Sequence, residues 1–173
     1  KKKKFYIKDR IQLVNFKKLK DYQNLPVVIV GMGAGTIYSS LGATHLSQED
    51  ISIARSLPNM QIIAPCDPNE LKKVIKYLIY RKTKNPIYLR IGKSGEKDYT
   101  SKVKEDWKFG KLRKIKEGKK ICFLTFGPII EICFEIRNQM LKKNINIAIY
   151  NAHTLKPVDE NNIKKIFKSF KKI

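Results

Sequence analysis

The chain has 173 residues and a formal net charge of +22, from 37 Lys and Arg against 15 Asp and Glu. Its length allows one ordinary domain or two small ones, and no apolar stretch approaches the roughly 20 residues needed to cross a bilayer. Lys is spread along the whole chain instead of being gathered with Arg and aromatic residues, which argues for a solvated basic surface and against a nucleic-acid reader.

The cysteines and the chain start bear on the compartment. Cys66, Cys122 and Cys133 are odd in number, lack CxxC spacing and lie in or beside apolar runs. This pattern argues against a disulfide framework or a zinc site and favours a reducing environment. The KKKK start is not followed by the apolar core of a signal peptide, so we expect a soluble, cytoplasmic protein.

The first predicted element is a buried β-strand in PVVIVG, residues 26–31, because its β-branched run lacks polar alternation. The stretch GMGAG, residues 31–35, follows as a glycine-rich loop. It departs from the dinucleotide fingerprint GxGxxG, since Thr36 stands where the third glycine is needed and no helical pattern follows directly.

A short helix is predicted after the stretch GATHLSQED. Ser47 and Asp50 have the S-x-x-D spacing of a capping box, and a mainly apolar segment then runs to Pro58. His45 is therefore expected just before the N-terminus of a helix.

The next three elements extend the same pattern. MQIIAP, residues 60–65, predicts a strand. A helix start is predicted directly after it, with Asp67 as cap, Pro68 at the first helical position and Glu70 three residues after the cap. Helical apolar spacing continues through LKKVIKYLIYRK, and PIYLRI, residues 86–91, predicts the returning strand. Strands alternating with helices imply a parallel sheet.

A second unit follows a polar stretch, residues 92–106, that shows no apolar periodicity and is predicted to be a linker or a surface excursion. ICFLTFG predicts a strand, PIIEICFEIRNQMLKK an amphipathic helix opened by Pro128, and INIAIYNA another strand. HTLKPVDENNIKKIFKSF then predicts a further helix with Asp159 as its cap. This unit alone would leave sheet edges unpaired.

Few residues offer chemistry from the pattern alone. No GxSxG elbow occurs, no cysteine has a histidine nearby in sequence, and His45 and His153 lack partners at metal-ligand spacing. His45 is a candidate ligand-binding residue because loops at helix N-termini over parallel sheets bind anions, although it also fits a purely structural place. Arg90, near the end of its strand, fits either an anion site at the sheet edge or a structural ion pair.

Two long blocks carry a family resemblance. YQNLPVVIVGMGAGTIYSSLGATHLSQEDISIARSLPNMQIIAPCDPNELKKVI followed by NPIYLRIGK resembles the pyrimidine-binding domain of the transketolase family. EGKKICFLTFGPIIEICFEIRNQMLKKNINIAIYNAHTLKPVDENNI resembles the start of the family's C-terminal domain. The resemblance implies an incomplete parallel-sheet pyrimidine-binding domain over residues 1–92, a linker over 93–118 and a partial α/β C-terminal domain over 119–173.

The resemblance also implies an activity. Enzymes of the family use thiamine diphosphate and a divalent metal, here Mg²⁺, to transfer a two-carbon ketol unit between sugar phosphates. His45 matches the histidine of the family's G-x-T-H motif, which faces the substrate and hydrogen-bonds to the forming intermediate. Arg90 matches the arginine that helps hold the sugar phosphate. Lys156 and Asp159, from the motif KP-(hydrophobic)-D, match structural positions.

Departures from the family pattern limit this implication. Leu41 and Gly33 stand where many full-length transketolases have an Asp and a second His. The glutamate that activates the aminopyrimidine and the whole diphosphate-binding domain have no counterpart, so the cofactor-binding residues of this chain are unknown and no metal ligand is predicted. We therefore expect a split or truncated subunit that is inactive without a complementary subunit carrying the diphosphate-binding domain.

Two alternatives stay open. One is the β-type subunit of a 2-oxoacid dehydrogenase, which shares the pyrimidine-domain architecture and would act on a 2-oxo substrate. The other is a non-catalytic basic protein that binds nucleic acid or another polyanion through its lysines.

Overall fold

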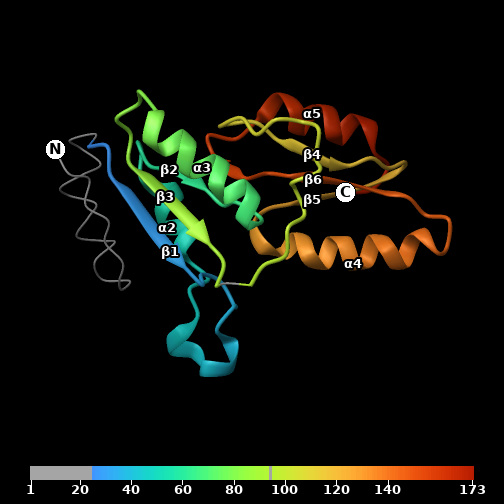
Figure 1. Cartoon of the computed structure of the whole chain (residues 1–173), viewed down its shortest axis with the longest axis horizontal. Coiled ribbons are helices and arrows are strands. Elements are labelled where there is room, and N and C mark those ends of the chain that lie inside the picture. Colours follow the sequence, from blue (N-terminus) through green and yellow to red (C-terminus); the bar gives the residue numbers. More distant parts are fainter. Residues whose placement is uncertain (1–24, 94) are drawn as a thin grey trace.

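The computed structural model describes residues 25–93 and 95–173, which form two sheets with helices packed on them (Figure 1). The expected α/β fold with parallel strands is confirmed. Within the described part of the chain, no helix has the length and apolar character needed to cross a membrane. In chain order the elements are β1 (Val28–Met32), the 3-10 turns η2 (Ser39–Leu41) and η3 (Ala43–His45), α2 (Asp50–Ser56), β2 (Gln61–Ile63), α3 (Pro68–Tyr80), β3 (Ile87–Ile91), β4 (Arg113–Lys116), β5 (Ile121–Thr125), η4 (Gly127–Ile129), α4 (Ile130–Leu141), β6 (Ile147–Asn151), β7 (Thr154–Lys156) and α5 (Glu160–Ser169).

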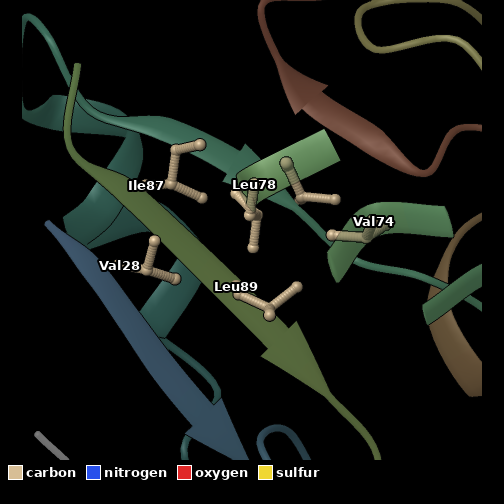
Figure 2. Packing of buried hydrophobic residues seen from close by; sticks show 6 residues of the cluster. Val28, Val74, Leu78, Ile87 and Leu89 are labelled. Atoms are coloured by element: carbon tan, nitrogen blue, oxygen red, sulfur yellow. The ribbon is translucent and has the colours of Figure 1, made fainter. Parts of the chain in front are cut away.

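The first sheet has the strand order β1-β3-β2-β7, and its first three strands are parallel. Both of its faces are buried, which explains the continuous apolar runs of these strands. Figure 2 shows the packing on one face, where α3 contributes Val74 and Leu78. On the other face α2 contributes Ala54. The strand residues on the two faces alternate, with Val28, Ile63, Ile87 and Leu89 on the first and Ile62 and Tyr88 on the second.

The start of α3 is the predicted one. Asp67 caps the helix by accepting a hydrogen bond from the backbone N–H of Glu70 at 2.7 Å, and Pro68 occupies the first helical position. The same carboxylate also accepts from the backbone N–H groups of Tyr99 and Thr100. The cap therefore ties the end of the first sheet to the segment that follows it.

The second sheet has the order β4-β6-β5, with β5 and β6 parallel and β4 antiparallel to β6. Strand β4 lies inside residues 93–118, so the expectation that this stretch is only a linker is wrong at this point: Arg113 and Ile115 are buried. The sequence RKIK has no apolar run that would predict a strand, and the strand forms by pairing with β6. The domain limits at 92 and 119 stay a prediction.

Strand β7 corrects a second expectation. For the stretch from His153 onward the sequence predicts only a helix capped by Asp159, but ahead of that cap Thr154–Lys156 form a strand that pairs antiparallel with β2. Helix α5 begins at Glu160 with Asp159 as its cap, as predicted. The backbone N–H groups and carbonyls of β2 stabilise β7, and the two halves of the chain consequently share one sheet.

Candidate functional site

A loop between β1 and α2 projects beyond the carboxyl ends of β1 and β3 (Figure 1). Its base is closed by two backbone hydrogen bonds, from Gly35 N to Ser47 O at 2.9 Å and from Ser47 N to Gly35 O at 3.1 Å. The loop itself contains the two 3-10 turns and is largely exposed. Carboxyl ends of parallel strands are where α/β sheets bind ligands, so this loop is the first candidate site.

The glycines of GMGAG let side chains pack closely against the loop base. A Cβ on Gly31 would lie 2.2 Å from the Tyr88 hydroxyl, and one on Gly35 would lie 2.6 Å from Arg90 Nη2. Gly35 also has a φ of +85°, which a side chain would strain. The glycine pattern thus serves close approach of Tyr88 and Arg90.

Arg90 lies on β3 and forms an ion pair at the loop base. Its Nε donates to Asp50 Oδ2 at 2.8 Å, and the Tyr88 hydroxyl donates to the same oxygen at 2.7 Å. Burial, together with this bond to Asp50, raises the pKa of the Tyr88 hydroxyl, which therefore stays a donor. Among the described residues, no hydrogen bond involves Arg90 Nη1 or Nη2. The structural ion pair that the sequence allows is present, and it uses Nε without engaging these two nitrogens.

Asp50 is the site residue that local sequence pattern does not reveal. The predicted capping box is wrong: α2 begins at Asp50 itself, and Glu49 occupies the cap position without a side-chain capping hydrogen bond. The Asp50 carboxylate turns instead toward Tyr88 and Arg90, whose sequence separations from it, 38 and 40, hide the contact from local pattern. Its second oxygen, Oδ1, is buried and has no hydrogen-bond partner among the described residues.

His45 ends the η3 turn, two residues before the loop base at Ser47. Its ring is exposed, and Nδ1 lies 3.1 Å from Thr44 Oγ1. Since α2 starts only at Asp50, His45 neither caps nor begins that helix. His45 and Arg90 thus belong to the same loop and its base, although no hydrogen bond or ion pair joins them within the described residues.

His153 has a different environment. It is buried, its ring lies 4.9 Å from that of Trp107, and Nδ1 is 3.0 Å from Thr154 Oγ1. Burial, with a further contribution from the Arg113 charge, lowers its pKa to about 3, so the ring is neutral at pH 7. His153 is a core histidine.

The described residues offer no metal centre of their own. Across residues 25–93 and 95–173, no group of three or more His, Cys, Asp or Glu side chains is placed to hold a metal ion. The three cysteines are unpaired thiols, and burial raises the pKa of Cys122 to about 11, which disfavours its thiolate at neutral pH.

Two family models match the sequence. One is described as the transketolase pyrimidine binding domain and matches residues 14–95, and the other as the transketolase C-terminal domain and matches residues 110–173. Together they cover most of the chain.

Similar proteins agree with these matches. The chain is 28% identical to a subunit of the apulose-4-phosphate transketolase of Phocaeicola vulgatus, over 83% of this chain and 46% of that protein. It is 33% identical to the 1-deoxy-D-xylulose-5-phosphate synthase of Clostridium acetobutylicum, over 83% of this chain and 23% of that protein. The chain therefore spans less than half the length of these curated relatives.

A solved structure shares the fold. The inactive β4 tetramer of a split-gene transketolase superposes with a TM-score of 0.80 and 24% identity, over 93% of this chain and 51% of that one.

Proposed function

Because the chain belongs to the transketolase family, we propose that it supplies one side of a shared thiamine-diphosphate active site for ketol transfer between sugar phosphates. The observation that carries the proposal is the loop at the sheet edge, which holds the exposed His45 above a base where Arg90 is anchored to Asp50. An exposed imidazole and an arginine whose Nη1 and Nη2 have no hydrogen-bond partner among the described residues suit a polar, anionic substrate.

The roles of the two residues follow from their chemistry. His45 would donate a hydrogen bond to a substrate oxygen on which negative charge develops, since its ring is exposed and can approach it. Arg90 would bind the phosphate through Nη1 and Nη2, the geometry in which a guanidinium recognises an oxyanion.

The described residues do not fit the cofactor by themselves. They offer no cluster of acidic, His or Cys side chains for Mg²⁺, which bridges a diphosphate to its protein. We therefore assign the diphosphate and the metal to a complementary subunit. Two of the similar proteins, one named as a transketolase subunit and one as a split-gene transketolase, support such a division of the site.

Calorimetric titration tests the shared site. The 173-residue chain alone, titrated with thiamine diphosphate and Mg²⁺, should release no saturable heat. The partner would be identified by mass spectrometry after co-purification with the tagged chain from its source cells, then co-expressed with it, and the complex should bind the cofactor. Saturable binding by the chain alone would contradict the assignment to a complementary subunit.

An activity assay on the same complex tests the reaction. Transfer of a two-carbon unit from a ketose phosphate to an aldose phosphate is expected, with loss of transfer in Arg90→Met. Decarboxylation of pyruvate without ketol transfer would favour the β-type dehydrogenase subunit. Strongly salt-dependent binding of a polyanion that survives His45→Ala, with no cofactor binding by the complex, would favour the basic binding protein.

A further inference from the structure

The Asp50 carboxylate is buried at the base of the site loop, with its side chain 2% exposed, and one of its oxygens accepts from two donors. One donor is Arg90 Nε and the other is the Tyr88 hydroxyl. Breaking the contact with Arg90 would leave a buried carboxylate without its cation, which is energetically costly. The contact therefore holds the Arg90 side chain in place.

Arg90 is also confined from the side of the loop. Its Nη2 lies so close to Gly35 that a Cβ there would be 2.6 Å away. Gly35 is itself fixed by its pair of hydrogen bonds to Ser47. The guanidinium is therefore held at Nε by Asp50 and against the loop base by Gly35.

We infer that Asp50 is a positioning residue for anion binding, holding the Arg90 guanidinium so that Nη1 and Nη2 are presented to a substrate phosphate. The inference rests on the proposed role of Arg90. An arginine normally loses much side-chain freedom when it binds a ligand, and a guanidinium already fixed at Nε has less to lose. Asp50 itself does not touch the substrate.

Two effects of removing the Asp50 charge have opposite signs. A carboxylate beside Arg90 repels an incoming phosphate, so a change to Asn would tighten binding if charge were all that mattered. If Asp50 positions the guanidinium, the same change weakens binding, because the freed side chain must be ordered by the ligand. The direction of the change therefore decides between the two.

The experiment is NMR of the full 173-residue chain labelled on arginine, titrated with inorganic phosphate. The chain has six arginines, so the Arg90 Nε–H signal can be assigned by its loss in Arg90→Met. This signal reports phosphate binding at Arg90 and not phosphate binding at surface lysines. We expect the wild-type Arg90 signal to shift on titration and to report an apparent Kd. In Asp50→Asn that Kd should rise roughly 3- to 10-fold, the range of one side chain's ordering cost.

Two control variants separate positioning from other effects. Tyr88→Phe removes the other donor to the same carboxylate but keeps the ion pair, and should change the Kd by less than about 2-fold. Asp106→Asn removes an exposed carboxylate elsewhere and should leave the Kd unchanged. Should Asp50→Asn fail to fold, Asp50→Ser, which keeps an acceptor for Tyr88, takes its place.

The outcomes are distinct. An equal or lower Kd in a folded Asp50 variant overturns the positioning role while leaving Arg90 as the anion ligand. No phosphate-dependent shift of the wild-type Arg90 signal removes the anion role of Arg90, and the positioning role with it. Hydrogen exchange of the wild-type Arg90 Nε–H needs no variant: exchange as fast as at the exposed Arg55 would also overturn the inference, whereas slow exchange supports it.

Discussion

Glu70 and Arg113 form an ion pair that solvent does not reach. Glu70 Oε1 and Arg113 Nη1 are 3.5 Å apart, and the Arg113 and Glu70 side chains are 1% and 0% exposed. The other carboxylate oxygen accepts from Cys66 N and from Asn151 Nδ2, so α3 is joined to both β4 and β6. Burial raises the pKa of the Glu70 carboxyl, against the bond from Cys66 and the Arg113 charge, which lower it. This polar junction connects the two halves of the chain.

Breaking one side of the pair should be costly. Arg113→Met leaves Glu70 buried without its cation, and we expect the free energy of unfolding to fall by about 3–5 kcal/mol in urea denaturation. The double variant Glu70→Leu, Arg113→Met should lose less than the sum of the single changes. Lys164→Met is the matched control, because its pair with Glu160 is exposed and should contribute little to stability.

Acid should weaken the core through His153. Its pKa is about 3 in the folded chain against an ordinary value of 6.5, so the unfolded state binds the proton first as pH falls. Stability from the neutral ring is complete above about pH 6.5 and is lost progressively toward pH 3, by at most about 1.4 kcal/mol per pH unit. Urea unfolding at several pH values, followed by fluorescence of the single Trp107, measures this loss.

His153→Phe is the comparison for that measurement. The difference between this variant and wild type at pH 7 gives the packing effect of the substitution. Between about pH 6.5 and about pH 4 the variant should lose less unfolding free energy than the wild type, and the difference measures the contribution of His153 protonation. Equal losses in the two proteins would contradict this role of His153.

Removing the His45 ring should affect turnover and not stability. In the assembled enzyme His45→Ala is expected to lower kcat on the order of 100-fold or more, as for loss of a group that stabilises developing charge. Because the ring is exposed, the Tm of the chain should not change. Ser40→Ala on the same loop serves as control for kcat, and an unchanged rate in His45→Ala would remove the proposed role.

Lys156 should stabilise the end of α2. Its Nζ donates to Arg55 O at 3.0 Å and also to Leu57 O. A cation at a helix C-terminus is favourable, so Lys156→Met should cost about 1–3 kcal/mol and speed hydrogen exchange of the α2 amides. Lys102→Met, at an exposed turn position outside the helices, should change neither.

The start of α3 was predictable because its signals are local. Asp67, Pro68 and Glu70 lie within four positions, and each acts on backbone groups of the same turn. β4 and β7 were not predictable, because their sequences RKIK and TLK lack the apolar run that reveals the other strands, and they form through partners far along the chain. Their formation depends on β6 and β2.

In the candidate site, too, local sequence signals were predictable and contacts between distant residues were not. His45 and Arg90 are singled out by their neighbours in sequence and by the family resemblance, and their roles in binding and catalysis stay predictions. The S-x-x-D spacing assigns Asp50 to a helix cap because that spacing is a local rule. In the fold the Asp50 carboxylate accepts instead from Tyr88 and Arg90, which are distant in sequence and are stronger donors than the backbone N–H of a helix cap.

The pairing of β7 with β2 also governs how the protein can be made. Ile63 and Thr154 are about 90 positions apart, so during translation the outer edge of β2 has no strand beside it until most of the chain has been synthesised. An open strand edge invites pairing with other nascent chains, which makes early pieces prone to aggregation. A cut between the two halves would expose that edge permanently, so an expression fragment meant to isolate the site loop should extend through Lys156.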